Sequence, residues 1–168
     1  MSVGREIKKL NPFEAIEQEA MLNLARTYDV LAGEIAMQVF KPAGLSAAQY
    51  NVLRILRGAG AGEHLPCGEI ANRMVARDPD MTRLLDRLEK RKLVSRCRQR
   101  DDRRVVAVRI TDAGLALLAE LDPNLLAAHR AQLGHMDEAE LKQLIALLEK
   151  ARQRTQTDPQ ETHHDHDR

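Results

Sequence analysis

The chain has 168 residues, a formal net charge of +1, two Cys and no Trp, and its only Phe and Tyr residues are two of each. This length can form a domain with its own hydrophobic core, and two cysteines are too few to hold a fold of this size together with disulfides. No apolar run approaches the ~20 residues of a membrane span and residues 1–6 have no apolar signal-peptide stretch, so we expect a cytoplasmic protein without a membrane partner.

The first predicted element is a long helix over residues 13–39. Its apolar positions recur at steps of three and four residues, namely at Leu24, Tyr28, Leu31, Ile35 and Val39. Residues 41–44, Lys-Pro-Ala-Gly, end this helix because proline and glycine interrupt helical backbone.

Three shorter helices are predicted next. Ser46 and Gln49 have the spacing of a capping box, so a helix begins there, continues to about residue 57 and ends in the glycine run 58–62. A second helix over residues 67–75 would direct Ile70, Met74 and Val75 inward. For a third helix over 79–91, Asp78 is the expected N-cap and Pro79 lies in the first turn.

The helix over 79–91 has two distinct faces. Its apolar residues form one narrow stripe at Met81, Leu84, Leu85 and Leu88, whereas a row of cations at Arg83, Arg87 and Lys90 lies on another face. The pattern therefore predicts a helix that buries leucine on one side and presents positive charge on the other.

Strands follow over residues 93–99 and 104–110, joined by a charged turn at 100–103. Residues 111 and 112 then cap a leucine-rich helix, which we expect Pro123 to kink or interrupt. A last helix is expected after Asp137, as N-cap, with Glu140 at the third position and an apolar stripe at Leu141, Leu144, Ile145 and Leu148. The polar tail 155–168 is expected to be flexible.

This order of elements is that of a winged helix-turn-helix, in which the third helix enters the major groove and the hairpin forms the wing. The charge distribution agrees with this interpretation. Between Arg73 and Arg109 there are 13 Lys and Arg and six Asp and Glu, a balance of +7, while the other 131 residues have a balance of −6. A concentrated basic segment points to double-stranded DNA as partner, although solvated surface charge is the alternative.

The flanking helices have more apolar surface than one small winged helix can cover. We therefore expect a mainly α protein in which residues 13–40 and 112–154 form a helical dimerisation region and residues 45–110 form the DNA-binding domain. Two-fold symmetry would place two recognition helices about one DNA turn apart, as a palindromic site requires. The alternative is an intramolecular helical cap.

Three segments resemble the multiple antibiotic resistance regulator (MarR) family. Residues 45–53 (LSAAQYNVL) resemble the start of its second helix, and residues 80–94 (DMTRLLDRLEKRKLV) resemble its recognition helix and the approach to the wing. Residues 101–104 (DDRR), followed by Thr111 and Gly114, resemble its wing signature. The resemblance implies a homodimeric winged-helix transcription regulator, usually a repressor relieved by a small ligand or an oxidant.

The resemblance also implies residue roles. Thr82, Arg83 and Arg87 match groove-facing positions, and Asp102 matches an acid that braces Arg104 for the minor groove. Two departures are Lys92, where the family more often has glycine, and residues 77–80, which replace small and hydroxylated residues. The complete set of candidate DNA-binding residues is Arg77, Asp80, Thr82, Arg83, Arg87, Arg100, Asp102, Arg103 and Arg104.

An effector pocket between the dimer helices and the winged helix is implied in the same way. Its candidate residues are Tyr28, Met37 and Tyr50, chosen by position, with core packing as the alternative role. Cys67, at the start of a short helix, and Cys97, in a strand expected to be half-buried, could form a redox switch or serve as small core residues.

Other functions have weaker support in the sequence. His163, His164 and His166 with Asp165 could bind a metal, but a tail provides no fixed geometry and we expect no metal or cofactor. No phosphate-binding glycine loop or zinc-protease pair is present, so an enzyme is not expected. A winged-helix module for protein interaction and a cysteine-based redox regulator stay as alternative functions.

Overall fold

The computed structural model describes residues 2–60, 62–76, 78–98 and 106–153. The chain falls into two compact units, one ending at Ala128 and the other beginning at His129. The described residues are predominantly helical, with one small antiparallel sheet, which confirms the predicted fold class.

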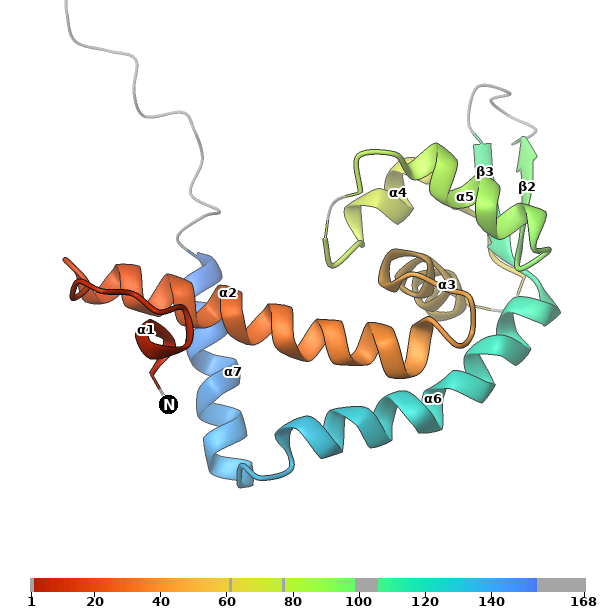
Figure 1. The fold of residues 1–168 in the computed structure, drawn as a ribbon. Coiled ribbons are helices and arrows are strands. Elements are labelled where there is room, and N and C mark those ends of the chain that lie inside the picture. Colours follow the sequence, from red (N-terminus) through yellow and green to blue (C-terminus); the bar gives the residue numbers. More distant parts are fainter. Residues whose placement is uncertain (1, 61, 77, 99–105, 154–168) are drawn as a thin grey trace, which may run out of the picture. The chain divides into compact units, whose positions relative to one another are not determined.

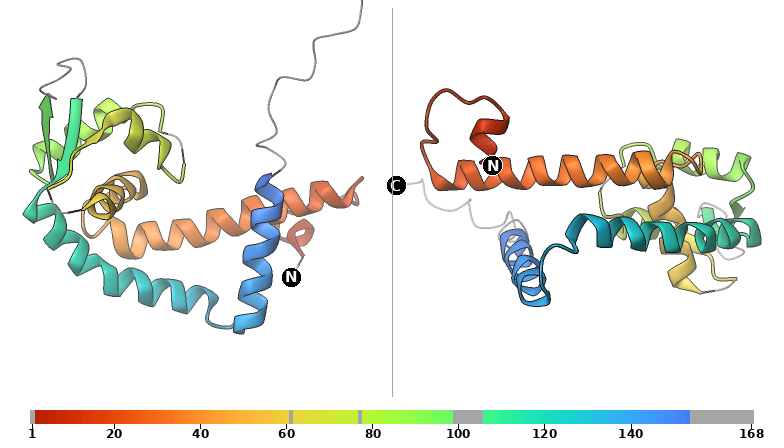
Figure 2. Two further views of the ribbon diagram at one scale, coloured as in Figure 1. Left: turned by 180° about the vertical axis from the view of Figure 1, so that it is seen from behind. Right: turned by 60° about the horizontal axis from the view of Figure 1, so that its bottom comes forward.

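The N-terminal part of the first unit contains α1 (Val3–Glu6), α2 (Ile16–Ile35) and a π-helical turn, η1 (Ala36–Phe40). The predicted long helix is confirmed, but it begins at Ile16 because Ala15 has extended backbone angles. The wider π turn places two consecutive residues, Val39 and Phe40, in the core. By contrast, α2 has no buried residue, and α1 packs against it (Figure 2).

A tight turn ends η1 as predicted. Gly44 has φ +66°, and the amide of Leu45 donates to the carbonyl of Phe40 at 2.9 Å, which is the hydrogen bonding of a Schellman motif. Arg91, far along the chain, donates from its guanidinium to the carbonyl oxygens of Ala43 at 3.0 Å and Gly44 at 2.6 Å. The turn is therefore held both by its own backbone and by Arg91.

Helix α3 (Ala47–Ala59) begins with the predicted capping box: the amide of Gln49 donates to Ser46 Oγ at 3.2 Å, and the amide of Ser46 donates to Gln49 Oε1 at 2.9 Å. It ends at Ala59, two residues later than expected, and is followed by the C-cap Gly60 with φ +115°. Its apolar side faces the core of the unit, which is built mainly from Val52, Leu53, Leu56, Ile70, Leu85, Leu88, Val94, Val108 and Leu118.

Helix α4 (Cys67–Asn72) is shorter than predicted. It buries Ile70, and Met74 is partly buried as expected, but Val75 is 80% exposed, so its predicted inward position is wrong. The reason is that the helix ends at Asn72, and residues beyond it leave the helical register on which the prediction depended.

Helix α5 (Met81–Lys90) begins at a different cap from the one predicted. Asp80, not Asp78, is the N-cap: its Oδ1 accepts from the amide of Arg83 at 3.0 Å. Asp78 Oδ1 instead accepts from the amide of Asp80 at 2.8 Å, an Asx turn that precedes the helix. The apolar stripe is confirmed, because Leu84, Leu85 and Leu88 are buried and Met81 is partly buried.

The sheet has the order β1-β3-β2 with antiparallel pairing of β1 (Leu65–Pro66), β2 (Val94–Arg98) and β3 (Val106–Ile110). Leu65 and Arg96 both pair with Val108, from opposite sides of β3. Strands β2 and β3 match the prediction within the described residues. The two-residue strand β1 was not predicted, because it is too short for any periodicity. Figure 1 shows β2 and β3 beside α5.

Helix α6 (Asp112–Leu133) passes through Pro123 without interruption, so the predicted break is wrong. Proline removes one backbone hydrogen bond, and contacts of the preceding residues compensate: Leu118 and Leu121 are buried, and Asp122 binds Arg57. The predicted cap is confirmed, since Thr111 Oγ1 accepts from the amide of Gly114 at 3.2 Å.

The second unit contains α7 (Glu138–Gln153), whose capping box is confirmed: Glu140 donates from its amide to Asp137 Oδ1 at 2.8 Å, and Asp137 donates from its amide to Glu140 Oε2 at 2.9 Å. Leu141, Leu144 and Leu148 are half-buried, while Ile145 is exposed. None of the helices in the described ranges combines the length and apolar character that a bilayer crossing requires.

Candidate nucleic-acid interface

The exposed face of α5 forms the candidate interface. Thr82, Arg83, Arg87 and Lys90 are exposed on it, while Leu84, Leu85 and Leu88 anchor the opposite face in the core. The Arg83 side chain is 77% exposed, and its Nε lies 3.6 Å from Oδ2 of the N-cap Asp80. The structure therefore presents a row of cations on a helix whose other side is fixed by packing.

Several predicted DNA-binding residues lie outside the described residues. They are Arg77 and four residues of the expected wing, namely Arg100, Asp102, Arg103 and Arg104. Among the candidates that the structure does describe, Asp80 caps α5, and Thr82, Arg83 and Arg87 are exposed on it. The proposed bracing of Arg104 by Asp102 stays a prediction.

Lys92, which replaces the family's more usual glycine, has φ +59°. Its amide donates to the carbonyl of Glu89 at 2.8 Å, and the amide of Leu93 donates to the carbonyl of Leu88 at 3.0 Å. These are the two hydrogen bonds of a Schellman motif, so lysine adopts the left-handed conformation that glycine favours. Lysine therefore ends α5 in the type of turn that usually contains glycine.

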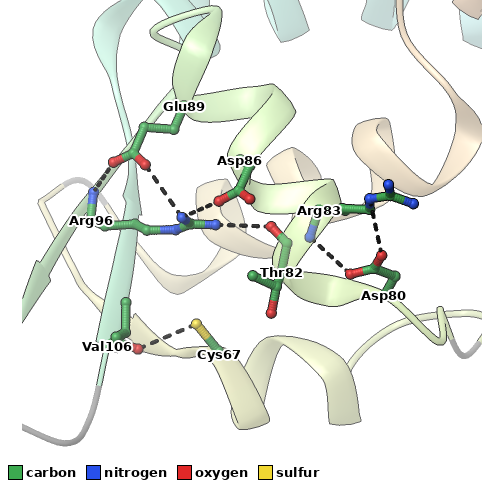
Figure 3. Close-up of polar contacts among 8 residues, drawn as sticks. All are labelled: Cys67, Asp80, Thr82, Arg83, Asp86, Glu89, Arg96 and Val106. Atoms are coloured by element: carbon green, nitrogen blue, oxygen red, sulfur yellow. Dashed lines mark hydrogen bonds and ion pairs between the residues drawn. The ribbon is translucent and has the colours of Figure 1, made fainter.

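Arg96 was missed by sequence reasoning. It lies on β2 and its guanidinium contacts α5: Nη1 lies 2.5 Å from Asp86 Oδ1 and 3.4 Å from Glu89 Oε2, and Nη2 donates to the carbonyl oxygen of Thr82 at 3.1 Å (Figure 3). The amide of Arg96 also donates to Glu89 Oε1 at 3.2 Å. The only sequence signal was a charged residue on a strand beside a helix with two acids.

The candidate effector residues lie in different environments. Tyr50 is half-buried on α3 and stacks on Phe40, with ring centroids 4.8 Å apart. Tyr28 and Met37 are 67% and 59% exposed, and nine residues of helix separate them by roughly 13 Å along the axis. Met37 Sδ instead lies 3.9 Å from Lys41 Nζ. The first unit by itself therefore does not place Tyr28 and Met37 in one pocket.

A second polar contact that sequence reasoning missed lies near Tyr50. Arg57 on α3 binds Asp122 on α6 through two hydrogen bonds of 2.6 and 3.2 Å. The hydrogen bond to Asp122 raises the pKa of Arg57, so its charge is retained. Burial, and then the negative charge of Asp122, raise the pKa of Tyr50 above its ordinary value of 10.0. The Tyr50 phenol is therefore neutral at physiological pH.

An open hollow of about 620 Å³ lies at α1 and the start of α2, with Arg5, Lys9 and Phe13 among its lining residues. None of the three candidate effector residues lines it.

The two cysteines are separated by the sheet. Cys67 Sγ donates to the carbonyl of Val106 at 3.4 Å, and Cys97 pairs with Ala107 from the other side of β3. Cys97 is exposed, while Val94 on the same strand is buried, as expected of a strand that is covered on one side. Two strand spacings amount to about 10 Å, beyond the Cα separation of a disulfide, so these cysteines cannot pair within one chain without rearrangement.

Within the described ranges, no three His, Cys, Asp or Glu side chains are grouped as metal ligands. The candidate ligands His163, His164, Asp165 and His166 lie outside those ranges.

Three helices, α3, α4 and α5, followed by the antiparallel pair β2 and β3, define a winged helix-turn-helix protein. The family model of the MarR family matches residues 45–106. A solved MarR transcription factor from Planctomyces limnophilus is 46% identical, with a TM-score of 0.64 over 82% of this chain and 98% of that one. The chain belongs to the MarR family, whose members are transcription regulators rather than enzymes.

Two further proteins are similar to this chain. The transcriptional repressor MdtR of Bacillus subtilis is 28% identical over 86% of this chain and 91% of its own length. The structure of BpsR from Bordetella bronchiseptica, a protein whose DNA binding is regulated by 6-hydroxynicotinic acid, is 25% identical with a TM-score of 0.70, over 80% of this chain and 98% of that one.

Proposed function

We propose that this transcription regulator is a homodimeric repressor that binds a palindromic DNA duplex and is released by a small-molecule effector. The observation that carries the proposal is the arrangement of α5, with its leucines buried and Arg83, Arg87 and Lys90 exposed on one face. A major groove of about 12 Å admits one such helix.

The wing completes the proposed DNA contact. Residues 100–104 follow β2, which contacts α5. With α5 in the major groove, the arginines among residues 100–104 would reach the adjacent minor groove. The local balance of +7 over residues 73–109, against −6 elsewhere, supports a confined electrostatic footprint rather than general adhesion to polyanions. Arg77, Arg100, Arg103 and Arg104 would supply phosphate contacts.

The dimer would be formed by residues 13–40 and 112–154, and residues 155–168 would be a tail. Exposed apolar side chains on the helices of each unit support a dimerisation role for these residues, since large exposed apolar patches usually mark interaction surfaces. They are Met21, Leu24 and Tyr28 on α2, Leu126 on α6, and Ile145 and Leu147 on α7. In a two-fold dimer, the recognition helices would lie about 34 Å apart, matching half-sites one DNA turn apart.

Repression and release by an effector are proposed from the relatives. MdtR is a repressor, and the DNA binding of BpsR responds to an aromatic carboxylic acid. An effector of this kind would bind between the dimer helices and the winged helix, where Tyr50 and the dimer partner's surface would meet.

The test begins with selection of bound duplexes from a random pool, followed by titrations at several salt concentrations. The unmodified chain should prefer a palindrome, and log Kd should rise steeply with log salt because bound phosphates release counterions. Arg83→Met and Arg87→Met should each weaken binding and reduce the salt slope by about one. Lys8→Met, which removes an exposed cation outside both the proposed DNA-binding and dimerisation regions, is the control.

A salt slope near zero, or equal affinity for every duplex, would contradict the DNA-binding proposal. No binding at low salt, together with capture of a protein partner, would instead support the winged-helix module for protein interaction. Candidate aromatic acids are then added to the complex, and release of the duplex at a defined stoichiometry is the expected result.

Dimerisation is tested by sedimentation. Leu24→Glu should shift the chain toward monomer, because it places a charge on the exposed stripe of α2. Val30→Glu is the matched control: Val30 is similarly exposed but lies about 120° away around the same helix. A dimer that is weakened equally by both substitutions would rule out this stripe as the interface.

A further inference from the structure

We infer that Arg96 is a positioning residue for DNA recognition: from β2 it sets the rotation of α5 about its own axis, so that the cations of α5 face the groove. The inference rests on the proposed DNA binding and adds a residue that does not itself contact DNA. It differs from the basic residues on the exposed face because its guanidinium is directed toward the protein.

The contacts of Arg96 cover two turns of α5. They reach the carbonyl oxygen of Thr82, the carboxylate of Asp86 and the carboxylate of Glu89. These positions are i, i+4 and i+7 of the helix and therefore form one line along its side. A single contact would allow the helix to rotate, but contacts at three points along a line fix both its rotation and its distance from β2. Figure 3 shows the guanidinium on this side of the helix.

Each contacted residue is next in sequence to a proposed DNA-binding residue or to an exposed cation. Arg83 follows Thr82, Arg87 follows Asp86, and Lys90 follows Glu89. A rotation of α5 by about 20° would move the side chains at its surface by about 2 Å, since a helix with its side chains has a radius of about 6 Å. A hydrogen bond to a base edge does not tolerate that displacement.

Arg96 contributes to orientation more than to stability. Its side chain is 21% exposed, and its Nε is buried with no hydrogen-bond partner among the described residues. The desolvation of this guanidinium is therefore incompletely compensated, and ion pairs with that property add little net stability. Apolar packing of Leu84, Leu85 and Leu88 already attaches α5 to the core, but packing of leucines alone permits small rotations.

The acids bound by Arg96 make it possible to distinguish a positioning role from a general effect of charge on DNA affinity. Asp86 and Glu89 lie on the helix that would approach a polyanion. If only the charge of Asp86 mattered, Asp86→Asn would tighten binding to every duplex. If Asp86 matters as an anchor for Arg96, the same substitution weakens binding to the selected duplex and leaves a scrambled duplex nearly unaffected. The two explanations therefore predict opposite signs.

The experiment measures Kd for the selected duplex and for a scrambled duplex with the unmodified chain, Arg96→Met, Asp86→Asn and the double variant. We expect each single variant to lose about tenfold affinity for the selected duplex, and the double variant to be no weaker than the weaker single variant. Binding to the scrambled duplex should change by less than about twofold, with an unchanged salt slope. Arg109→Met is the control, since it removes the same charge from β3 where Arg109 contacts Ser95.

Two results would overturn the inference. Losses that multiply in the double variant would mean that Arg96 acts on DNA directly, and tighter binding by Asp86→Asn would mean that charge alone matters. Melting curves verify folding; if Arg96→Met does not fold, Asp86→Asn keeps the test decisive through its sign. Failure of the proposed function is distinguishable because the unmodified chain would then not discriminate between the two duplexes.

Discussion

The hydroxyl of Thr111 donates a 2.7 Å hydrogen bond to the carbonyl oxygen of Lys92, the residue at which the chain leaves α5. The amide of Thr111 donates to the carbonyl of Leu93 at 3.1 Å, and its Oγ1 accepts from the amide of Gly114. One threonine thus joins the end of α5, the end of β3 and the beginning of α6. This accounts for the spacing of Thr111 and Gly114 behind the wing.

Replacing Lys92 by glycine should stabilise the protein by about 1 kcal/mol, because a side chain in the left-handed region costs about 1–2 kcal/mol and glycine avoids that cost. Urea unfolding followed by circular dichroism measures the change. Lys90→Gly, two residues earlier and inside α5, is the matched control and should destabilise by about 1 kcal/mol. Changes of the same sign in the two variants would contradict the assignment of strain to Lys92.

Gly114→Ala should destabilise the protein by about 3 kcal/mol. A Cβ at Gly114 would lie 2.4 Å from the carbonyl oxygen of Leu93 and 2.7 Å from Cγ1 of Ile110, and the first of these atoms is backbone that cannot move aside alone. Thermal or urea unfolding measures the loss. Gly33→Ala is the control, because the new Cβ meets nothing within 4 Å. Replacing this helical glycine by alanine should raise the free energy of unfolding by up to about 1 kcal/mol.

The Arg57–Asp122 pair should show a coupling free energy of about 0.5–1 kcal/mol in a double-mutant cycle with Arg57→Met and Asp122→Asn. The guanidinium binds the carboxylate through two hydrogen bonds, but the side chains of Arg57 and Asp122 are 36% and 44% exposed, so water screens most of the attraction. High salt should reduce the coupling. A coupling near zero at low salt would mean that the pair does not help to hold α6 to α3.

The Tyr50 phenol should titrate above pH 10.0 in the folded protein, because burial and the charge of Asp122 raise its pKa. The unfolded chain would then ionise first, so the stability contributed by this group is complete below about pH 10 and is lost as the pH rises through the folded pKa. Phenolate absorbance in a Tyr28→Phe background, where Tyr50 is the only tyrosine, measures the titration directly. In Tyr50→Phe the alkaline loss of stability should be smaller, and an equal loss would contradict the expectation.

Local features were the ones that sequence reasoning predicted correctly. The capping boxes at Ser46 and Asp137 and the leucine stripe of α5 each depend on residues within one or two turns, where spacing determines the contact. The prediction of Asp78 as the N-cap of α5 was wrong, because a second aspartate, Asp80, also precedes the helix and spacing alone does not show where the helical backbone begins.

The contacts that could not be predicted join residues distant in sequence. Arg57 and Asp122 are 65 positions apart, and the side chain of Arg96 reaches acids whose orientation depends on where α5 packs. The uninterrupted course of α6 through Pro123 also depends on its surroundings, because buried neighbours compensate for the lost hydrogen bond. No local pattern contains this information.

The hydrogen bonds from Arg91 to the carbonyl oxygens of Ala43 and Gly44 have a genetic consequence. In a selection for alleles that have lost repression, substitutions in residues 41–45 should be recovered together with those in α5, although the two segments are far apart in sequence. The region of the gene that is sensitive to mutation would then be wider than the surface that we propose to face DNA, and it would include the turn that follows the π-helix.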